Sequence, residues 1–271
     1  MKLKAGFIWS GCFFLFCISL FSCIERRYYY LNPLHTNTAI YKPLPAQTDS
    51  QKTATYASAS LMVGSANDRG ADGVTGLYIN LHQARTAGPV QFFYGISASA
   101  GTYHVKQPDG YWFGNNPLDT IFIGANAGTK FTGSYGVFGG VFYVPLVVSR
   151  FEWRVVGIEA SHYGEYGQYL RFRQKLSDST ANGYMSKASF TSFGLATEFL
   201  FKTRRQTKIG FRLSYGYTPA KILNGYYNLG DRRPQYLSWA GQITKKRTTG
   251  FIQFSAGDYA FNFKLGCAYR L

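Results

Sequence analysis

The feature that most constrains the fold is an alternation of large apolar residues with small or polar ones, which runs from Thr53 almost to the end of the chain. In the last segment, Phe261 and Phe263 alternate with Asn262 and Lys264. Neighbouring residues of a β-strand point to opposite faces, so this pattern predicts strands with one apolar face. The pattern recurs in 208–217 and 90–100, where a helical period does not fit. The sequence therefore predicts an all-β domain over residues 53–271.

The alternation and the turn signals predict about twelve strands within a range of 8–12. They are placed at 54–65, 74–83, 90–103, 119–131, 135–147, 150–160, 168–176, 187–202, 208–218, 235–243, 249–256 and 260–270. Most are close to the ~9–11 residues that a tilted transmembrane strand needs. Short connections are expected at 84–89, 132–134, 161–167, 203–207 and 244–248, and long ones at 66–73, 104–118, 177–186 and 219–234. Short turns that alternate with long loops are typical of an up-and-down antiparallel β-barrel in an outer membrane.

The first 22 residues have the layout of a secretory signal peptide. Lys2 and Lys4 precede an apolar run without acidic residues, which ends in Leu20-Phe21-Ser22-Cys23. The run is too short for a permanent span. An ordinary signal peptide followed by a chance cysteine is the alternative to a lipid-attachment site. Residues 23–52 contain three prolines, and we expect them to form a tether on the same side of the membrane as the start of the first strand.

The composition restricts the partners. The formal net charge is +16, and removal of Lys2 and Lys4 lowers it to +14. Nucleic acid is the usual partner of such a chain, but an exported protein rarely meets it. Anionic lipid headgroups, lipopolysaccharide phosphates and acidic sugars are better candidates. No metal-ligand spacing or phosphate-binding loop is present, so we expect no cofactor.

The two faces of the strands predict which side meets lipid. Small residues mixed with charged ones suit a wet lumen, while the aromatic and aliphatic face suits lipid. Glu152 and Glu198 are the only acidic residues predicted on the inward face. The basic candidates for the lumen are Arg171, Arg173, Lys175, Arg212, Lys264 and Arg270. Rings of Arg and Lys favour anions, so a pore or cavity for anionic solutes is one hypothesis. A closed lumen in which these side chains pair is the other.

Two resemblances follow from these patterns. Residues 20–23 resemble the lipobox of bacterial lipoproteins, which implies cleavage before Cys23 and attachment of a lipid to its sulfur. The alternation over 54–271 resembles the outer-membrane β-barrel families of Gram-negative bacteria, although the chain ends on Arg270-Leu271 where those families commonly end on an aromatic residue. Together they imply a lipid-anchored protein of the cell outer membrane, with outer-membrane lipids and the barrel-insertion and lipoprotein-sorting machineries as partners.

The function expected from the sequence is structural or porin-like. The sequence has no Gly-x-Ser-x-Gly elbow, and Ser161-His162 are adjacent in sequence without any sign of a third catalytic group, so we expect no enzyme. The alternative is a lipid-anchored, soluble, lipocalin-like barrel in the periplasm, with its apolar face turned inward around a small apolar ligand.

Overall fold

The computed structural model describes residues 29–49, 52–67, 72–106, 126–148, 150–176, 183–203, 207–222, 233–257 and 260–271. The elements are β1 (Tyr29–Tyr30), β2 (Thr53–Ala66), β3 (Asp72–Ala87), β4 (Val90–Val105), β5 (Gly128–Tyr143), β6 (Leu146–Val148), β7 (Phe151–Gly167), α3 (Gln168–Gln174), β8 (Gly183–Tyr184), β9 (Ser189–Lys202), β10 (Lys208–Tyr217), β11 (Gln235–Lys245), β12 (Thr248–Gly257) and β13 (Ala260–Arg270).

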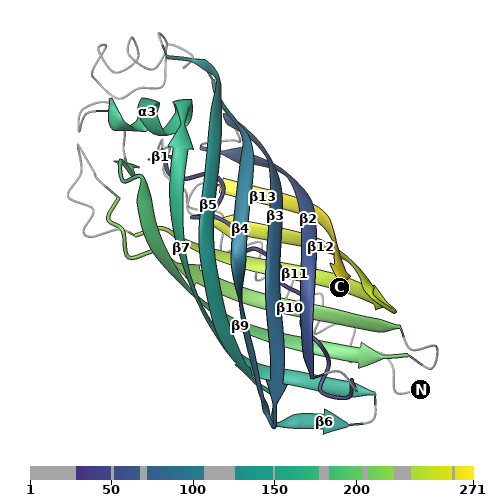
Figure 1. The fold of residues 1–271 in the computed structure, drawn as a ribbon. Coiled ribbons are helices and arrows are strands. Elements are labelled where there is room, and N and C mark those ends of the chain that lie inside the picture. The colour runs from purple at the N-terminus through teal and green to yellow at the C-terminus, as the bar shows by residue number, and fades with distance from the viewer. Residues whose placement is uncertain are drawn as a thin grey trace, which may run out of the picture.

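Ten of the described strands close into an antiparallel barrel (Figure 1). The barrel strands are β2, β3, β4, β5, β7 and β9–β13, and each one pairs with the next barrel strand in sequence. The first and last strands then pair with each other, from Arg270 opposite Tyr56 to Ala260 opposite Ala66. Closure leaves no open edge around the barrel. The short strand β6 pairs with the start of β7 outside this ring, and β1 pairs with β8 in parallel.

The prediction of about twelve strands was too high by two. The strands expected at 119–131 and 135–147 correspond to one strand, β5, because residues 132–134 continue the ladder to β4 and β7 as extended backbone. Residues 119–125 lie outside the described part of the chain. The turn expected at 161–167 is likewise part of β7, which runs on to Gly167. Gly133 and Gly164 belong to the stretches expected as turns, but they lie in strands where tyrosine rings cover them: a Cβ on Gly133 would meet the Tyr166 ring.

The strand expected at 168–176 is a helix over most of its length. Gly167 has a φ of 119°, which ends β7, and α3 follows directly. The helix buries Tyr169, Leu170, Phe172 and Arg173, a spacing that fits one helical face better than alternate residues do. No helix in the described ranges has the length and apolar character that a membrane crossing requires.

The connections define two ends of the barrel. Residues 88–89, 149–150, 203–207 and 246–247 join strands at one end, called here the turn end. The opposite, loop end carries residues 106–127, 168–188 and 218–234, together with the shorter connections 67–71 and 258–259. The connections expected at 84–89, 203–207 and 244–248 are therefore short, as predicted.

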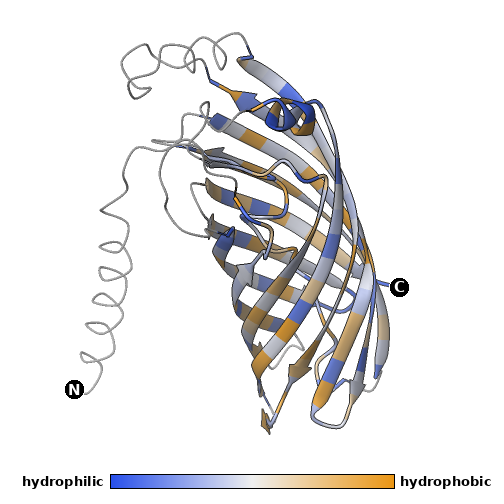
Figure 2. Cartoon of the chain, turned by 90° about the vertical axis from the view of Figure 1, so that its left-hand side faces the viewer, coloured by the Kyte–Doolittle hydropathy of each residue, from blue (hydrophilic) through white to orange (hydrophobic). Residues whose placement is uncertain are grey.

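The apolar face points outward and the polar face inward. In β13, Phe261, Phe263 and Leu265 are exposed, while Asn262 and Lys264 are buried. Figure 2 shows hydrophobic and hydrophilic residues alternating along the barrel strands. Exposed large apolar side chains occur on each of the ten barrel strands. Such an outer surface is stable only against lipid, so the lipocalin-like arrangement, with apolar residues turned inward, is wrong.

The barrel interior holds the amino-terminal part of the described chain. Residues 29–49, named here the lumen segment, are buried along nearly their whole length. The segment starts at the loop end, where β1 pairs with β8, and it reaches the turn end, where the Gln47 amide donates to the Gly88 carbonyl. The sequence predicted these residues as part of a tether outside the barrel. The structure places them inside it.

A charge on the outer face tests the assignment of the lipid-facing surface. Leu195 lies midway along β9 and Ile243 lies close to the turn end of β11, and both are more than half exposed. We expect Leu195→Arg to lower the free energy of unfolding by about 2–4 kcal/mol and Ile243→Arg by about 0–1 kcal/mol, because the cost of a charge falls with distance from the bilayer centre. Urea unfolding in lipid vesicles measures both, and equal small losses would contradict a membrane-facing surface.

Candidate functional site: a filled lumen

The loop end of the lumen is packed with aromatic residues from the wall, from α3 and from the lumen segment. Tyr30 meets Phe172 edge to face with ring centroids 5.3 Å apart, and Tyr103 stacks on Tyr169 at 4.1 Å. Burial raises the pKa of the Tyr169 phenol, so this group stays neutral. Helix α3 thus closes the loop end over the first residues of the lumen segment (Figure 1).

The middle of the lumen segment is held by wall side chains that donate hydrogen bonds to its backbone carbonyls. The segment makes no strand ladder between Leu31 and Asp49, so its carbonyls need other donors. The donors come from six strands. They are Tyr78 to Leu34 (2.8 Å), Asn262 to Asn37 (3.2 Å), Gln253 and Lys264 to Ala39 (3.0 and 2.8 Å), Arg212 to Lys42 (2.9 Å), His82 to Pro43 (2.8 Å), and Gln91 and Arg154 to Pro45 (2.8 and 3.0 Å).

Glu198 is the centre of a buried ion network. It accepts hydrogen bonds from Arg154 at 2.5 Å and from Arg212 at 3.0 Å. Tyr41 of the lumen segment and Gln242 each donate to its other oxygen at 3.0 Å. An ionised carboxylate offers about four acceptor positions, so Glu198 is saturated. A buried charge with this many partners is stable where an unpaired one would not be.

The charges along the lumen are closer to balance than the sequence predicted. Lys42 donates to Glu159 at 2.7 Å, and Arg173 pairs with Glu165 at the loop end. Glu159 was missed because β7 contains a β-bulge between Arg154 and Gly157, and Glu165 was missed because residues 161–167 were expected to form a turn. One extra residue reverses which alternate positions face inward, so Glu159 and Glu165 join Glu152 in the lumen.

The predicted basic lumen residues fall into two groups. Arg173, Arg212 and Lys264 are buried inside, and Arg270 lies at the turn end, 3.7 Å from Asp49. Arg171 and Lys175 do not line the lumen: Arg171 lies on α3, Lys175 is its C-cap, and both are exposed, since a helix replaced the expected strand. Cys23 lies outside the described residues.

Lys264 differs from the other buried basic groups. Its ammonium donates to the Ala39 carbonyl and lies 3.8 Å from the centre of the Tyr78 ring. Within the described part of the chain no carboxylate pairs with it. A carbonyl and an aromatic face therefore compensate this charge.

His35 of the lumen segment lies between two wall serines. Its Nε2 atom is 2.5 Å from the Ser134 hydroxyl and 3.1 Å from the Ser99 hydroxyl, and its ring stacks on Tyr163 at 3.8 Å. A histidine beside a serine resembles a nucleophile and its base, but a working pair needs a group that orients the histidine. The Nδ1 atom of His35 has no hydrogen-bond partner in the described structure. The arrangement anchors the lumen segment and lacks the features of a catalytic pair.

Ser161 and His162 are not catalytic partners either. His162 was expected in a periplasmic turn, but it lies on the outer face of β7 and is 3.0 Å from the Thr191 hydroxyl. No three His, Cys, Asp or Glu side chains of the described ranges come together as a metal site.

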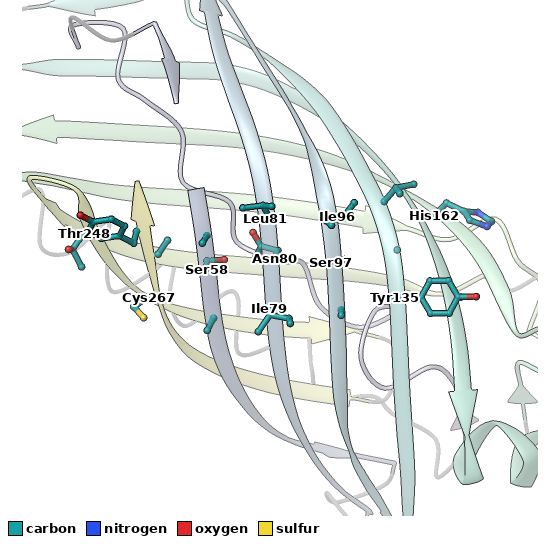
Figure 3. A pocket seen from close by; sticks show the side chains of 18 of the residues that line it. Ser58, Ile79, Asn80, Leu81, Ile96, Ser97, Tyr135, His162, Thr248 and Cys267 are labelled. Carbon is teal, nitrogen blue, oxygen red and sulfur yellow. The ribbon is translucent and has the colours of Figure 1, made fainter. Parts of the chain in front are cut away.

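A broad depression lies on the outer wall, away from the polar network (Figure 3). Its volume is about 1040 Å³, and it forms where small residues such as Ala57, Ala59 and Ala98 lie between larger ones such as Ile79 and Tyr135. This surface belongs to the lipid-facing belt. Cavities next to the lumen segment are far smaller, about 20 Å³ at the turn end and about 10 Å³ at the loop end. The described lumen therefore holds its own chain and leaves little room for a solute.

Sequence reasoning missed this donor set because it placed the lumen segment in a tether outside the barrel. Gln91, Gln253 and Asn262 are long polar residues on inward positions where small residues are otherwise common. That excess of side-chain amides is a usable signal, because an amide can donate to a carbonyl as an Arg or Lys can. The second part of this signal is the aromatic and proline-rich segment before β2, whose carbonyls accept these hydrogen bonds.

The closed barrel, the apolar outer face and the polar interior define an outer-membrane β-barrel. No family model matches the sequence, and no curated protein matches it. Similar solved structures include Neisserial surface protein A (10% identity, 82% of this chain and 97% of that one, TM-score 0.35). They also include an outer membrane channel from Pseudomonas putida F1 (9%, 89% and 99%, 0.43) and the outer membrane protease OmpT from Escherichia coli (8%, 80% and 98%, 0.34). These proteins differ in function, so the similarity concerns the fold alone.

The ion network predicts a large effect of one amide substitution. Glu198→Gln leaves Arg154 and Arg212 without the charge they share, so we expect a loss of about 3–5 kcal/mol in the free energy of unfolding. The matched control is Asp49→Asn at the turn end, where the Asp49 and Lys208 side chains are 14% and 18% exposed and solvent screens the pair. Urea unfolding followed by tryptophan fluorescence compares the two variants. Similar losses would show that the central network does not hold the lumen together.

Proposed function

We propose that this protein is a closed outer-membrane barrel with a structural, membrane-anchoring role, attached in addition by a lipid on Cys23. The observation that carries the proposal is the lumen segment. Its backbone carbonyls use the inward Arg, Lys, Gln, Asn and His side chains that an open pore would present to a solute. Donors that are already engaged are not available to an anion.

The lipid anchor rests on the lipobox-like Leu20-Phe21-Ser22-Cys23 and on the signal-peptide layout before it. The membrane location is supported by the outward apolar side chains. We propose no catalytic activity, since the Nδ1 atom of the buried His35 has no hydrogen-bond partner in the described structure that would orient the ring.

A pore for anionic solutes is the second candidate. It is favoured by Lys264, whose charge is balanced by a carbonyl and a ring and by no described carboxylate. This function requires the lumen segment to leave, which would free Lys264. It would also release the Arg212 and Arg154 donors that bind the Lys42 and Pro45 carbonyls, while both arginines stay paired with Glu198. The two candidates therefore differ in whether the segment moves.

A disulfide that fixes the lumen segment separates the two. The Thr38 and Ser255 hydroxyl oxygens are 3.0 Å apart, so cysteines at both positions lie within disulfide range. In a Cys267→Ala background, we expect neither the parent protein nor the oxidised Thr38→Cys/Ser255→Cys variant to conduct in planar bilayers. Steady conductance of the parent, together with conductance of the Thr38→Cys/Ser255→Cys variant that oxidation abolishes and a reductant restores, would overturn the closed role. An anion-selective reversal potential would then support the pore. Thr38→Cys alone is the control for the substitution itself.

A further inference from the structure

The lumen segment has a fixed direction through the barrel. At the loop end the Tyr29 amide donates to Asn67 at 2.7 Å, next to the end of β2. Halfway along, Thr38 meets Ser255, and Tyr41 donates to Glu198. At the turn end, Lys208 donates to Asp49 at 2.6 Å. The chain therefore passes once through the lumen, from the loop end to the turn end, before it forms the first barrel strand.

The start of this path is firmly tied to the loop end. Tyr29 and Tyr30 pair in parallel with Gly183 and Tyr184, and the Met185 amide donates to the Tyr30 carbonyl at 3.1 Å. The residues that precede Tyr29 in the sequence are consequently connected to the barrel at its loop end. A tether on the turn side, as the sequence suggested, is not compatible with this attachment.

The distance to Cys23 restricts where a lipid can insert. Tyr29 is the sixth residue after Cys23, and a fully extended chain spans at most ~3.3–3.6 Å per residue, so the reach is about 20 Å. The apolar belt of such a barrel is about 25 Å tall. The route through the lumen is filled by the segment itself. A chain of this length therefore cannot carry acyl groups from the loop end to the leaflet at the turn end.

We propose that the lipid on Cys23 inserts into the leaflet at the loop end, which is the outer leaflet when the long loops face outside the cell. The proposal rests on the proposed function, because it takes Cys23 as acylated and the barrel as inserted in the outer membrane. The sequence between Cys23 and Tyr29 includes Arg26 and Arg27. Basic residues at this place in the sequence are attracted to the anionic headgroups of a leaflet.

Cysteine labelling on intact cells tests the placement. Three single-cysteine variants are made in a Cys267→Ala background. Arg26→Cys reports the amino-terminal side, Lys187→Cys the loop end and Arg247→Cys the turn end. Lys187 and Arg247 are exposed. With a membrane-impermeant maleimide, we expect the first two to react equally before and after the outer membrane is permeabilised. Arg247→Cys should react only afterwards. Incorporation of radioactive palmitate should be lost in Cys23→Ser.

The possible failures are distinguishable. If Arg26→Cys is protected like Arg247→Cys while Lys187→Cys reacts on intact cells, the outer-leaflet placement is wrong and the barrel assignment stands. If Arg247→Cys reacts on intact cells and the other two do not, the barrel is inverted and the outer-leaflet placement is wrong with it. Absence of the protein from the outer-membrane fraction, or palmitate labelling that does not depend on Cys23, would instead overturn the proposed function on which this inference rests.

Discussion

The structure depends on how the carbonyl groups of one irregular chain segment are satisfied inside a barrel. Residues 31–49 cross the lumen without a strand ladder, and Pro33, Pro43 and Pro45 cannot donate a backbone hydrogen bond. Such a segment presents more acceptors than donors, so the wall must supply donors. Arg154, Arg212, Lys264, Gln91 and Gln253 do so from different strands. Each of these bonds ties the segment to a separate part of the wall, and together they make the filled lumen a single packed unit.

This arrangement constrains the order of assembly. The lumen segment precedes β2, and the ring closes where β2 pairs with β13, the first and last strands of the barrel. A segment that enters from the loop end and fills the lumen cannot be drawn through a closed wall if its amino terminus carries acyl chains. In an acylated chain, the segment must therefore be in place before the seam between β2 and β13 forms. The central donors of β10 and β13, Arg212 and Lys264, are then paired with carbonyls as the wall closes around them.

The sequence predicted the outward faces of the barrel strands well and the lumen segment inside them poorly. Alternation is a property of each strand by itself, so the outward faces of β4, β10 and β13 followed directly from residues such as Phe92, Phe211 and Phe263. Strand number was harder, because residues 132–134 and 161–167 were expected as turns, whereas they continue β5 and β7. The inward acid Glu159 was missed because a single bulge reverses the parity of β7, and Glu165 was missed because its stretch was expected to be a turn. The contacts of the lumen segment are long-range, so no local pattern contains them.

The basic residues of the lumen illustrate why the sequence alone does not distinguish an anion pore from a filled lumen. An Arg or Lys that would attract an anion and one that donates to a backbone carbonyl are the same chemical group, and both are expected on an inward face. What differs is whether acceptors already occupy the lumen. Ala39 accepts from both Gln253 and Lys264, while Pro45 accepts from both Gln91 and Arg154, so in both cases a neutral amide donates alongside the cation. A wall built to conduct anions has no need of amides aimed at the same oxygen. The pairing of amide and cation on one carbonyl is therefore the better indicator of a wall that holds a chain.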